Sequence, residues 1–456
     1  MASAARKLVA IVIDGLTPAA LERAVERRTA PALKHLVEHG DYGYATSVFP
    51  SLTPVCMSSI ATGAYPDVHR IPHLVWYHRA EQRLVEYGSS FGAIMAAGTR
   101  RSILDTILYM NERHLSPAAV TVYEALDDAG LTTAAVNVTC YRGRTPHRAT
   151  IPIPRSALGP RRFFYYNLFE SDVTGAPLSV RRRSAGTVDG YAAAVGRWLV
   201  TRDGFDFLFY YLSDYDYFSH VTGPEAADDA LARADEAVGA LLDAAGGPDE
   251  FLQRYAVVLF ADHGQTPVTT PIRLEDAFAG LELLRRGGAG EIAVAASNRA
   301  AQVYRLGSCR RSVRELAERL DGYPGVEVAL FLEDGEAVAR RDGSEVRFDG
   351  SGALAGDPAV LDHPDAFVRA WTALRNPNAG ELLVSGAPGY EFADLGGKHH
   401  AGGGSHGSLC AGDSIVPMLT IGVERRPRSI VDVAPTILEH FGVEPPAYAS
   451  RLADAA

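Results

Sequence analysis

The chain has 456 residues, of which 47% are hydrophobic and 22% are charged, a balance typical of a folded globular protein. Its length allows a large core and roughly two or three domains. The net charge of −11 argues against a general nucleic-acid binder, because a phosphate backbone requires a basic protein face. A small phosphorylated substrate remains compatible with this charge, since bound metal ions would reverse the local field.

Up to Pro267 the chain alternates between strand-like and helix-like segments. The predicted strands occupy 8–13, 44–48, 133–138, 205–212 and 255–261. The predicted helices are one that begins near Pro18 and ends at Gly40, followed by 55–61, 118–129, 187–199 and 224–245. This alternation predicts an α/β fold, a three-layer α/β/α sandwich with a mostly parallel sheet.

The pattern changes after Pro267. Short strands are predicted at 301–306, 326–332, 337–340 and 345–348, with one helix at 312–320. We therefore expect residues 270–395 to form a smaller α+β insertion. Residues 1–269 and 396–456 would form the core domain, with a strand at 418–421 and a helix at 431–441 returning to the core sheet.

Cysteine usage and the chain start bear on the cellular compartment. The four cysteines, Cys56, Cys140, Cys309 and Cys410, form no CxxC pair, which predicts neither a disulfide framework nor a thiolate zinc site. The first strand begins too early for a signal peptide to precede it. No apolar run approaches the roughly 18 residues that a membrane span needs. We expect a cytoplasmic protein without a membrane span. The sequence is compatible with a homo-oligomer.

Three predicted strands end in metal-ligand residue types. Asp14 ends the first, Asp262 and His263 end another, and Asp216 and His220 follow a third. Parallel strands whose carboxyl ends carry Asp or His predict a metal site at that edge of the sheet. Carboxylates and imidazoles suit zinc or a similar divalent ion.

Thr53 and His406 complete a set of seven residues that predicts two divalent metal ions beside a threonine. Thr53 precedes Pro54 at a predicted helix start, where its hydroxyl could attack a phosphoryl group or could act only as a helix cap. Ser51 is the alternative nucleophile. His406 lies in a glycine-rich loop that allows close backbone approach.

Each signal has a structural alternative. Asp216 and His220 are spaced to share one helix face and one ion, but a solvated helix start would look the same, and Asp214 competes for the role. A buried His263 could be a hydrogen-bonded core residue. The loop of His406 could be a plain flexible segment, in which His399 or His400 would be alternative ligands. The joint pattern is therefore more specific than any of its parts.

These motifs together make the chain similar to the alkaline phosphatase superfamily, and most to its nucleotide pyrophosphatase/phosphodiesterase (type I phosphodiesterase) branch. Members share a strand-end Asp, a Thr six residues before a Ser-Ile-x-Thr-Gly-x-Tyr-Pro stretch, a D-x-x-x-H pair, a D-H-G and a late G-x-H-G. Here the stretch is 59–66, which assigns the nucleophile to Thr53. The resemblance covers roughly 7–75, 118–140, 205–270 and 398–443, and it leaves out the insertion.

The resemblance implies two zinc-like ions, with manganese as the alternative metal. The ion that activates the nucleophile would be held by the first set of ligands, Asp14, Thr53, Asp262 and His263. The ion at the leaving oxygen would be held by the second set, Asp216, His220 and His406. Thr53 would attack phosphorus, and water would hydrolyse the resulting phospho-threonine.

The substrate contacts depart from the family pattern. Family phosphodiesterases have Gly where this chain has Arg70, and Asn where it has Leu74, so Arg70 or His73 is a candidate replacement. Arg142 and Arg144 form a second candidate phosphate contact, with a solvated basic loop as the alternative. Four aromatic residues could stack on a base or could pack in the core: Trp76, Tyr77, Tyr87 and Phe91.

The leading hypothesis is a metal-dependent hydrolase that cleaves phosphodiester or pyrophosphate bonds of a small phosphorylated substrate. A phosphomonoesterase and a carbon–phosphorus hydrolase of the phosphonoacetate type are the enzymatic alternatives. A hypothesis of a different class is a non-catalytic, metal-dependent protein that binds a phosphorylated ligand. Sulfatases are disfavoured, because the segment at Cys56 lacks the required C/S-x-P-x-R box.

Overall fold

A computed structural model of the chain describes residues 6–150, 156–166, 168–171, 187–284 and 288–449. Its largest sheet has eight strands within this part of the chain, in the order β2-β22-β11-β1-β10-β5-β8-β9. Their bounds are β2 (Asp41–Thr46), β22 (Ile415–Ile421), β11 (Tyr255–Phe260), β1 (Lys7–Ile13), β10 (Phe207–Leu212), β5 (Thr133–Val136), β8 (Arg162–Tyr165) and β9 (Phe169–Ser171).

The centre of this sheet is parallel, as predicted. The strands β11, β1, β10, β5 and β8 run in one direction, while β22 and β9 pair antiparallel to their neighbours. In β1 every residue from Leu8 to Ile13 is 0% exposed. A strand covered by helices on both faces reads as a continuous apolar run, which is why β1 and β11 lack polar alternation.

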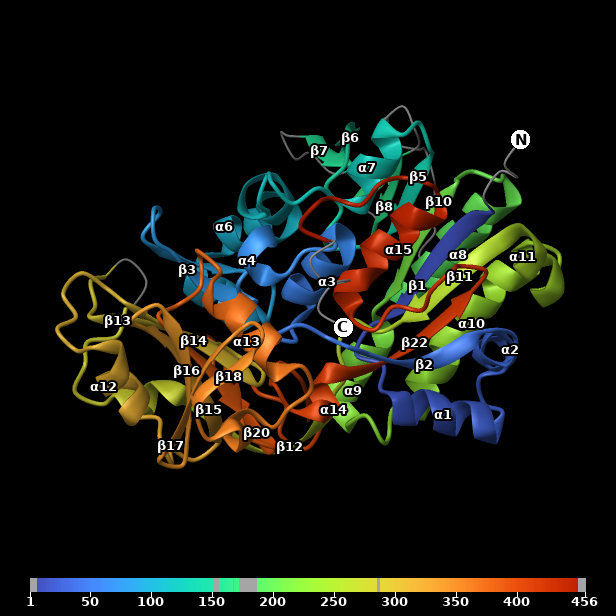
Figure 1. The fold of residues 1–456 in the computed structure, drawn as a ribbon. Coiled ribbons are helices and arrows are strands. Elements are labelled where there is room, and N and C mark those ends of the chain that lie inside the picture. Colours follow the sequence, from blue (N-terminus) through green and yellow to red (C-terminus); the bar gives the residue numbers. More distant parts are fainter. Residues whose placement is uncertain (1–5, 151–155, 167, 172–186, 285–287, 450–456) are drawn as a thin grey trace.

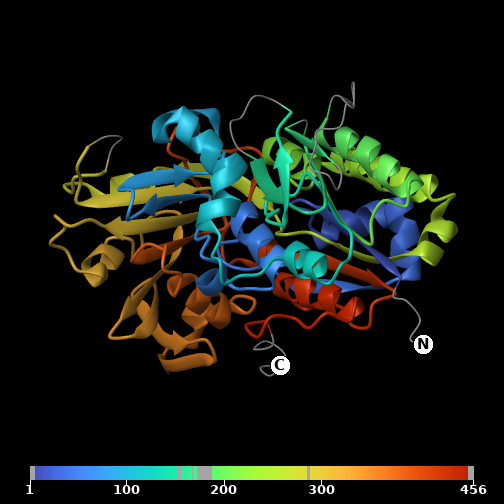
Figure 2. The ribbon, with the colours of Figure 1, turned by 90° about the horizontal axis from the view of Figure 1, so that it is seen from above.

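Helices cover both faces of the core sheet (Figure 1; Figure 2). On one face α2, α8 and α10 pack together, and on the other α3, α7 and α15 do. The core helices are α1 (Pro18–Arg27), α2 (Pro31–His39), α3 (Thr53–Thr62), α7 (Val122–Asp128), α8 (Val188–Thr201), α10 (Asp228–Ala244), α11 (Pro248–Arg254) and α15 (Val433–His440). The three-layer α/β sandwich is therefore confirmed.

The single helix expected from Pro18 to Gly40 is in fact two helices. Helix α1 ends at Arg27, and Arg28 closes it in the left-handed conformation at φ 59°. Helix α2 begins at Pro31. Proline has no N–H for a helical hydrogen bond and clashes with the preceding turn, so the helix must restart there. The apolar spacing continues across the break because both helices face the same core.

Smaller elements connect the core strands between residues 66 and 171. They are α4 (Pro66–His69), β3 (Val75–His78), β4 (Arg83–Glu86), α5 (Phe91–Ala97), α6 (Thr99–Leu104), a π-helical segment (Asp105–His114), β6 (Thr145–Arg148) and β7 (Ser156–Gly159). Part of the basic segment 142–154 forms the β6–β7 hairpin instead of a loop, and its residues 151–154 lie outside the described residues.

A second, antiparallel sheet lies beside the core, coloured yellow to orange in Figure 1. Its order is β13-β14-β19-β15-β16-β17-β18. The bounds are β13 (Ile292–Ser297), β14 (Ala300–Arg305), β15 (Val326–Glu333), β16 (Glu336–Arg341), β17 (Ser344–Asp349), β18 (Gly352–Gly356) and β19 (Leu382–Gly386). Helices α12 (Val313–Glu318) and α13 (Ala366–Leu374) accompany it.

A small three-stranded sheet connects this region to the core domain. It contains β20 (Gly389–Phe392), β12 (Thr266–Ile272) and β21 (Gly404–Ser405), in that order. Strand β12 follows Asp262 and His263, and β21 precedes His406, so this sheet joins two segments that carry candidate ligands. Among the described residues, no helix combines the length and the apolar character that crossing a membrane requires.

Candidate active site

The candidate ligands gather at the carboxyl edge of the core sheet. Asp14 directly follows β1, and Asp262 and His263 directly follow its neighbour β11. Asp216 lies in α9 (Asp214–Thr222), which begins just after β10, the other neighbour of β1. The carboxyl ends of adjacent parallel strands meet at one edge, so the sheet itself brings these side chains together.

The first set of expected ligands forms one contact group around His263. Its Nε2 lies 3.2 Å from Thr53 Oγ1, 3.3 Å from Asp14 Oδ1 and 3.5 Å from Asp262 Oδ2. Thr53 is the first residue of α3 and is followed by Pro54, a residue that favours helix starts. The rigid, buried start of α3 therefore holds the Thr53 hydroxyl beside these ligands.

The second set is centred on Asp216. His220 Nε2 lies 3.2 Å from Asp216 Oδ2, because the i, i+4 spacing places both side chains on one face of α9. His406 Nε2 lies 3.9 Å from Asp216 Oδ1. The two sets touch, since the rings of His263 and His406 stack with centroids 3.6 Å apart. Asp216, His263 and His406 thus also form a close group of their own.

All three imidazoles point Nε2 into the site and Nδ1 toward a backbone carbonyl. His263 Nδ1 contacts Gly264 O at 3.0 Å, His220 Nδ1 contacts Gly404 O at 2.8 Å, and His406 Nδ1 contacts Ser51 O at 2.8 Å. A carbonyl oxygen only accepts hydrogen bonds, so each Nδ1 carries the proton. Each Nε2 of a neutral ring then presents a lone pair, which is how metal-binding histidines are oriented.

Asp14 and Asp262 are buried, whereas Asp216 is partly exposed and pairs with His220. Burial raises the pKa of Asp14, and the charges of Asp262 and Asp216 raise it further. Burial also raises the pKa of Asp262. For Asp216 burial acts in the same direction, but the neighbouring His220 outweighs it and lowers the pKa. Burial lowers the pKa of His406.

The residues fit divalent metal ions. Asp14 Oδ1 and Asp262 Oδ2 are buried atoms that have no hydrogen-bond partner among the described residues, and both lie near His263 Nε2. Electron-rich atoms gathered in a buried place repel one another unless a proton or a cation lies among them. Oxygen and imidazole ligands of this kind suit zinc and manganese.

These residues open onto a cavity of about 610 Å³. Its lining includes Asp14, Thr53, Asp216, His220 and His406 from the expected site. Other polar and aromatic side chains lining it are Tyr87, Ser89, Tyr166, Asp214, Tyr217, Asn298, Lys398 and His400. The volume suits a small ligand of nucleotide size or below.

Three residues that support the site were not indicated by any sequence pattern. Tyr211 donates its hydroxyl hydrogen bond to Asp14 Oδ2, and Gln265 Nε2 donates to Asp216 Oδ1 at 2.8 Å. Asn298 Nδ2, in the turn between β13 and β14, lies 2.9 Å from His406 Nε2. Gln265 follows Asp262-His263-Gly264 directly, so position was its only sequence signal. Asn298 reaches the site from the second sheet, across more than a hundred residues.

The alternative nucleophile and the alternative ligands have partners outside the two sets of expected ligands. The Ser51 hydroxyl is buried and donates to Ser408 O at 3.1 Å. Asp214 Oδ2 accepts a hydrogen bond from the backbone N–H of Asp189 at 3.1 Å. His400 Nδ1 lies 2.6 Å from Glu391 Oε1, and His399 is exposed. Of the alternatives named here, Asp214 and His400 line the cavity.

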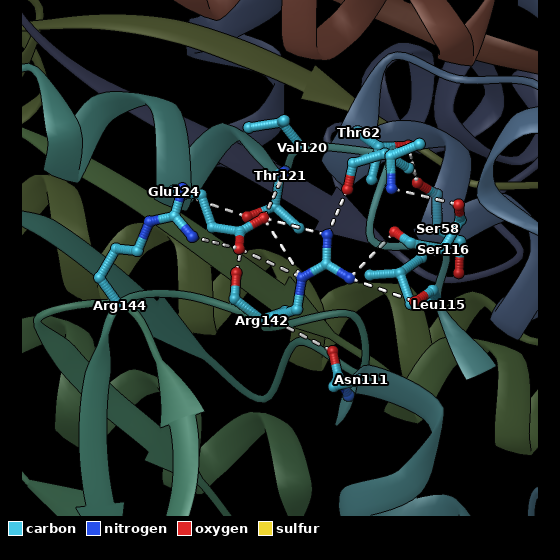
Figure 3. Close-up of polar contacts among 12 residues, drawn as sticks. Ser58, Thr62, Asn111, Leu115, Ser116, Val120, Thr121, Glu124, Arg142 and Arg144 are labelled. Atoms are coloured by element: carbon cyan, nitrogen blue, oxygen red, sulfur yellow. Dashed lines mark hydrogen bonds and ion pairs between the residues drawn. The ribbon is translucent and has the colours of Figure 1, made fainter. Parts of the chain in front are cut away.

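Arg142 and Arg144 are engaged with a carboxylate away from the cavity (Figure 3). Arg142 Nε lies 3.2 Å from each Glu124 oxygen, and Arg142 Nη1 donates to Leu115 O and Ser116 O. Arg144 Nη1 donates to Glu124 Oε1 at 2.9 Å. The described contacts give both residues a structural role at the start of α7, and neither lines the cavity.

Arg70 and His73 also lie outside the cavity lining. His73 is fully buried, accepts a hydrogen bond from Val75 N at Nδ1, and has a pKa lowered to about 4 by burial. Arg70 is exposed and closes α4 in the left-handed conformation at φ 67°. Glycine adopts that conformation without strain.

Arg70→Gly should therefore raise the free energy of unfolding by about 0.5 to 1 kcal/mol, because it removes Cβ strain at a helix end. Urea unfolding of both proteins measures the difference. Arg70→Ala is the matched control, since it removes the same guanidinium but keeps Cβ. Equal stabilisation by the two variants would show that charge, and not backbone conformation, is the cause.

The four aromatic candidates have separate environments. Trp76 and Tyr77 are buried in the core, and Phe91 is 72% exposed. Tyr87 lines the cavity, where its hydroxyl contacts His114 Nδ1 at 2.8 Å. Tyr217, which is 66% exposed and also lines the cavity, is a further ring that could stack on a ligand.

Comparisons with known proteins relate this chain to a family of phosphate-ester hydrolases. A family model described as "Type I phosphodiesterase / nucleotide pyrophosphatase" matches residues 8–409. A search of curated proteins finds no match. The structure is similar to murine ectonucleotide pyrophosphatase/phosphodiesterase 5, an inactive variant in complex with AMP, with a TM-score of 0.62, 12% identity and 96% of each chain covered.

The fold is equally similar to that of phosphonoacetate hydrolase from Sinorhizobium meliloti in complex with phosphonoacetate. That comparison has a TM-score of 0.63, 18% identity and 96% of each chain covered. Human ectonucleotide pyrophosphatase/phosphodiesterase 5 has a TM-score of 0.60 at 12% identity, over 96% of this chain and 95% of that one. At identities this low, the structural similarity establishes a shared fold and nothing more specific.

Proposed function

The chain belongs to the type I phosphodiesterase/nucleotide pyrophosphatase family and is a hydrolase of that class, and from this premise we propose that it cleaves phosphodiester or pyrophosphate bonds with Thr53 as nucleophile and two divalent metal ions. One observation above all supports the proposal. Three histidines donate Nδ1–H to backbone carbonyls and turn Nε2 toward buried aspartates beside the Thr53 hydroxyl.

The ligands divide into two sets in this proposal. Asp14, Asp262 and His263 would hold one ion together with the Thr53 oxygen. Asp216, His220 and His406 would hold the other. We favour zinc, with manganese as the alternative. When bound, the ions would act as Lewis acids for the attacking and leaving oxygens.

The chain's own residues supply the nucleophile and its position. Helix α3 places Thr53 in the lining of the cavity, where its Oγ1 would approach phosphorus in line with the leaving oxygen. The bond from Oγ1 to phosphorus forms as the bond to the leaving oxygen breaks. Water then attacks the phospho-threonine, which releases the phosphorylated product and restores the Thr53 hydroxyl.

The cavity lining supports a ligand with one phosphoryl group and a planar or apolar portion. Leu74 lines the cavity at the position of the family's Asn, so it cannot donate a hydrogen bond there. The Asn298 amide lies near His406 and could bind a phosphoryl oxygen in its place. Tyr87 and Tyr217 offer rings on which a base or an aryl ester could stack.

A carbon–phosphorus hydrolase is the second candidate, favoured by Lys398. This lysine also lines the cavity, and its charge would suit a second anionic group on the substrate. Phosphonoacetate, the ligand of one structural relative, carries a carboxylate besides its phosphonate. Its hydrolysis would consume one water and release acetate and inorganic phosphate.

The test compares bis-p-nitrophenyl phosphate with p-nitrophenyl phosphate, after metal removal and reconstitution with zinc or, separately, manganese. We expect faster cleavage of the diester, loss of activity in the metal-free protein and recovery when the metal returns. Faster monoester cleavage would overturn the diesterase proposal in favour of a phosphatase. Phosphate release from phosphonoacetate, with both nitrophenyl esters intact, would establish the second candidate.

A non-catalytic role makes a distinct prediction. A binding protein would take up the metals and a phosphorylated ligand but would turn over none of these substrates. Metal analysis of the same preparations separates this outcome from a failure to reconstitute the site.

A further inference from the structure

A second cluster of metal-ligand residue types lies outside the expected active site. It contains Glu327 in β15, His363 before α13, and Cys410 at the start of α14 (Ala411–Ser414). Cys410 Sγ is 3.1 Å from Glu327 Oε2, and His363 Nε2 is 3.6 Å from Glu327 Oε1. One ligand atom from each residue lies within 4.8 Å of the others.

His363 gives an independent reason to consider a ligand here. Its side chain is only 9% exposed, and its Nε2 is a buried atom for which the described part of the chain offers no hydrogen-bond partner. The 3.6 Å separation from the Glu327 oxygen is too long for a hydrogen bond. A buried polar atom without a partner costs free energy, and a bound ion among the three residues would satisfy it.

The three donors match zinc in chemistry and charge. Zinc takes thiolate, imidazole and carboxylate ligands together, in tetrahedral sites. A thiolate and a carboxylate would offset both charges of the ion within a mostly buried site. Arg341 Nη1 lies 3.5 Å from Glu327 Oε1, and Arg299 Nη2 lies 3.8 Å from Cys410 Sγ, whose thiol donates a hydrogen bond to Glu327.

The cluster borders a cavity through one of its members. His363 lines a cavity of about 520 Å³, together with Asp362 and Asp365, whereas Glu327 and Cys410 do not line it. Cys410 lies four residues after His406, so an ion here would link β15 of the second sheet to the loop that carries His406.

We propose that Glu327, His363 and Cys410 bind one zinc ion, at a site separate from the two-metal site. Binding forms a zinc–sulfur bond, and the Cys410 thiol proton passes to solvent. The ion would brace the junction between the second sheet and the His406 loop. This site depends on no step of the proposed catalytic reaction.

Cobalt substitution tests the proposal directly. A thiolate bound to Co²⁺ gives a near-ultraviolet charge-transfer band, whereas the Asp, His and Thr ligands of the two-metal site cannot. We expect the band in the unaltered, cobalt-loaded protein and its loss in Cys410→Ser. Cys309→Ser is the matched control, because Cys309 Sγ contacts Arg311 O at 3.9 Å and is not part of the cluster, so this variant should keep the band.

Zinc stoichiometry provides the second measurement. After zinc loading and desalting, Cys410→Ser and His363→Ala should each contain one equivalent less than the unaltered protein and Cys309→Ser. Absence of the band from the unaltered protein, or equal zinc content in all four proteins, would overturn the proposal. Thr53→Ala should retain the band, so failure of the catalytic proposal is distinguishable from failure of this one.

Discussion

Thr53→Ala is expected to lower kcat by roughly a thousandfold or more, because it removes the oxygen that forms the covalent intermediate. The aspartates and histidines of the site remain, so the variant should still bind both metals. Initial rates with bis-p-nitrophenyl phosphate, measured beside the metal content of the same preparation, check both parts. Radiolabelled or mass-shifted phospho-threonine should form in the unaltered protein and be absent from the variant.

Ser51→Ala is the matched control for this variant. Ser51 lies two residues before Thr53 and has a buried hydroxyl bonded to Ser408 O. Its loss should leave kcat within a few-fold of the unaltered protein, because this hydroxyl has a structural partner. If Ser51→Ala abolished turnover and Thr53→Ala did not, Ser51 would be the nucleophile.

Arg299→Met should lower the free energy of unfolding by about 3 to 5 kcal/mol, the usual cost of leaving one member of a buried ion pair. Both side chains of the Arg299–Asp413 pair are 0% exposed, and Nη1 lies 2.8 Å from Asp413 Oδ1. Asp413 also accepts a hydrogen bond from Ser408 N at 3.0 Å, close to His406. Equilibrium urea unfolding with metals removed measures the loss without a contribution from metal binding.

Arg311→Met is the control for Arg299→Met. Arg311 pairs with Glu315 at 3.0 Å, but the two side chains are 51% and 45% exposed, so water and salt screen the interaction. An exposed pair of this kind contributes little to the free energy of unfolding, so Arg311→Met should leave the urea midpoint nearly unchanged. Equal destabilisation by the two variants would contradict the prediction that burial makes the loss of Arg299 more costly.

Local patterns were enough to predict six strands of the core sheet and the positions of its polar strand ends, but they did not indicate β8 or β9. The apolar run before Asp14 and the run before Asp262 each read as a buried parallel strand, and both lie at the centre of the sheet. Because parallel strands expose their carboxyl ends at one edge, strand position alone predicted that these aspartates would meet. The i, i+4 spacing of Asp216 and His220 likewise predicted their contact.

Two other features of the sequence were misread, each for a different reason. Pro31 marks the start of α2, yet the apolar spacing suggested one continuous helix. Arg142 and Arg144 read as a free basic loop because their partner, Glu124, lies in a separate helix. Charge on a segment does not reveal whether an opposite charge folds against it.

The sequence by itself determined the alternation of strands and helices in most of the core, the residue types at the strand ends and the chemistry that those types allow. Only the tertiary structure decided which distant groups support or join them. Asn298 reaches His406 from the second sheet, and Glu327, His363 and Cys410 meet although the spacing of the cysteines predicted no thiolate metal site. The physical reason is that strand and helix periodicity acts over a few residues, whereas these contacts depend on how two sheets pack after hundreds of residues have folded.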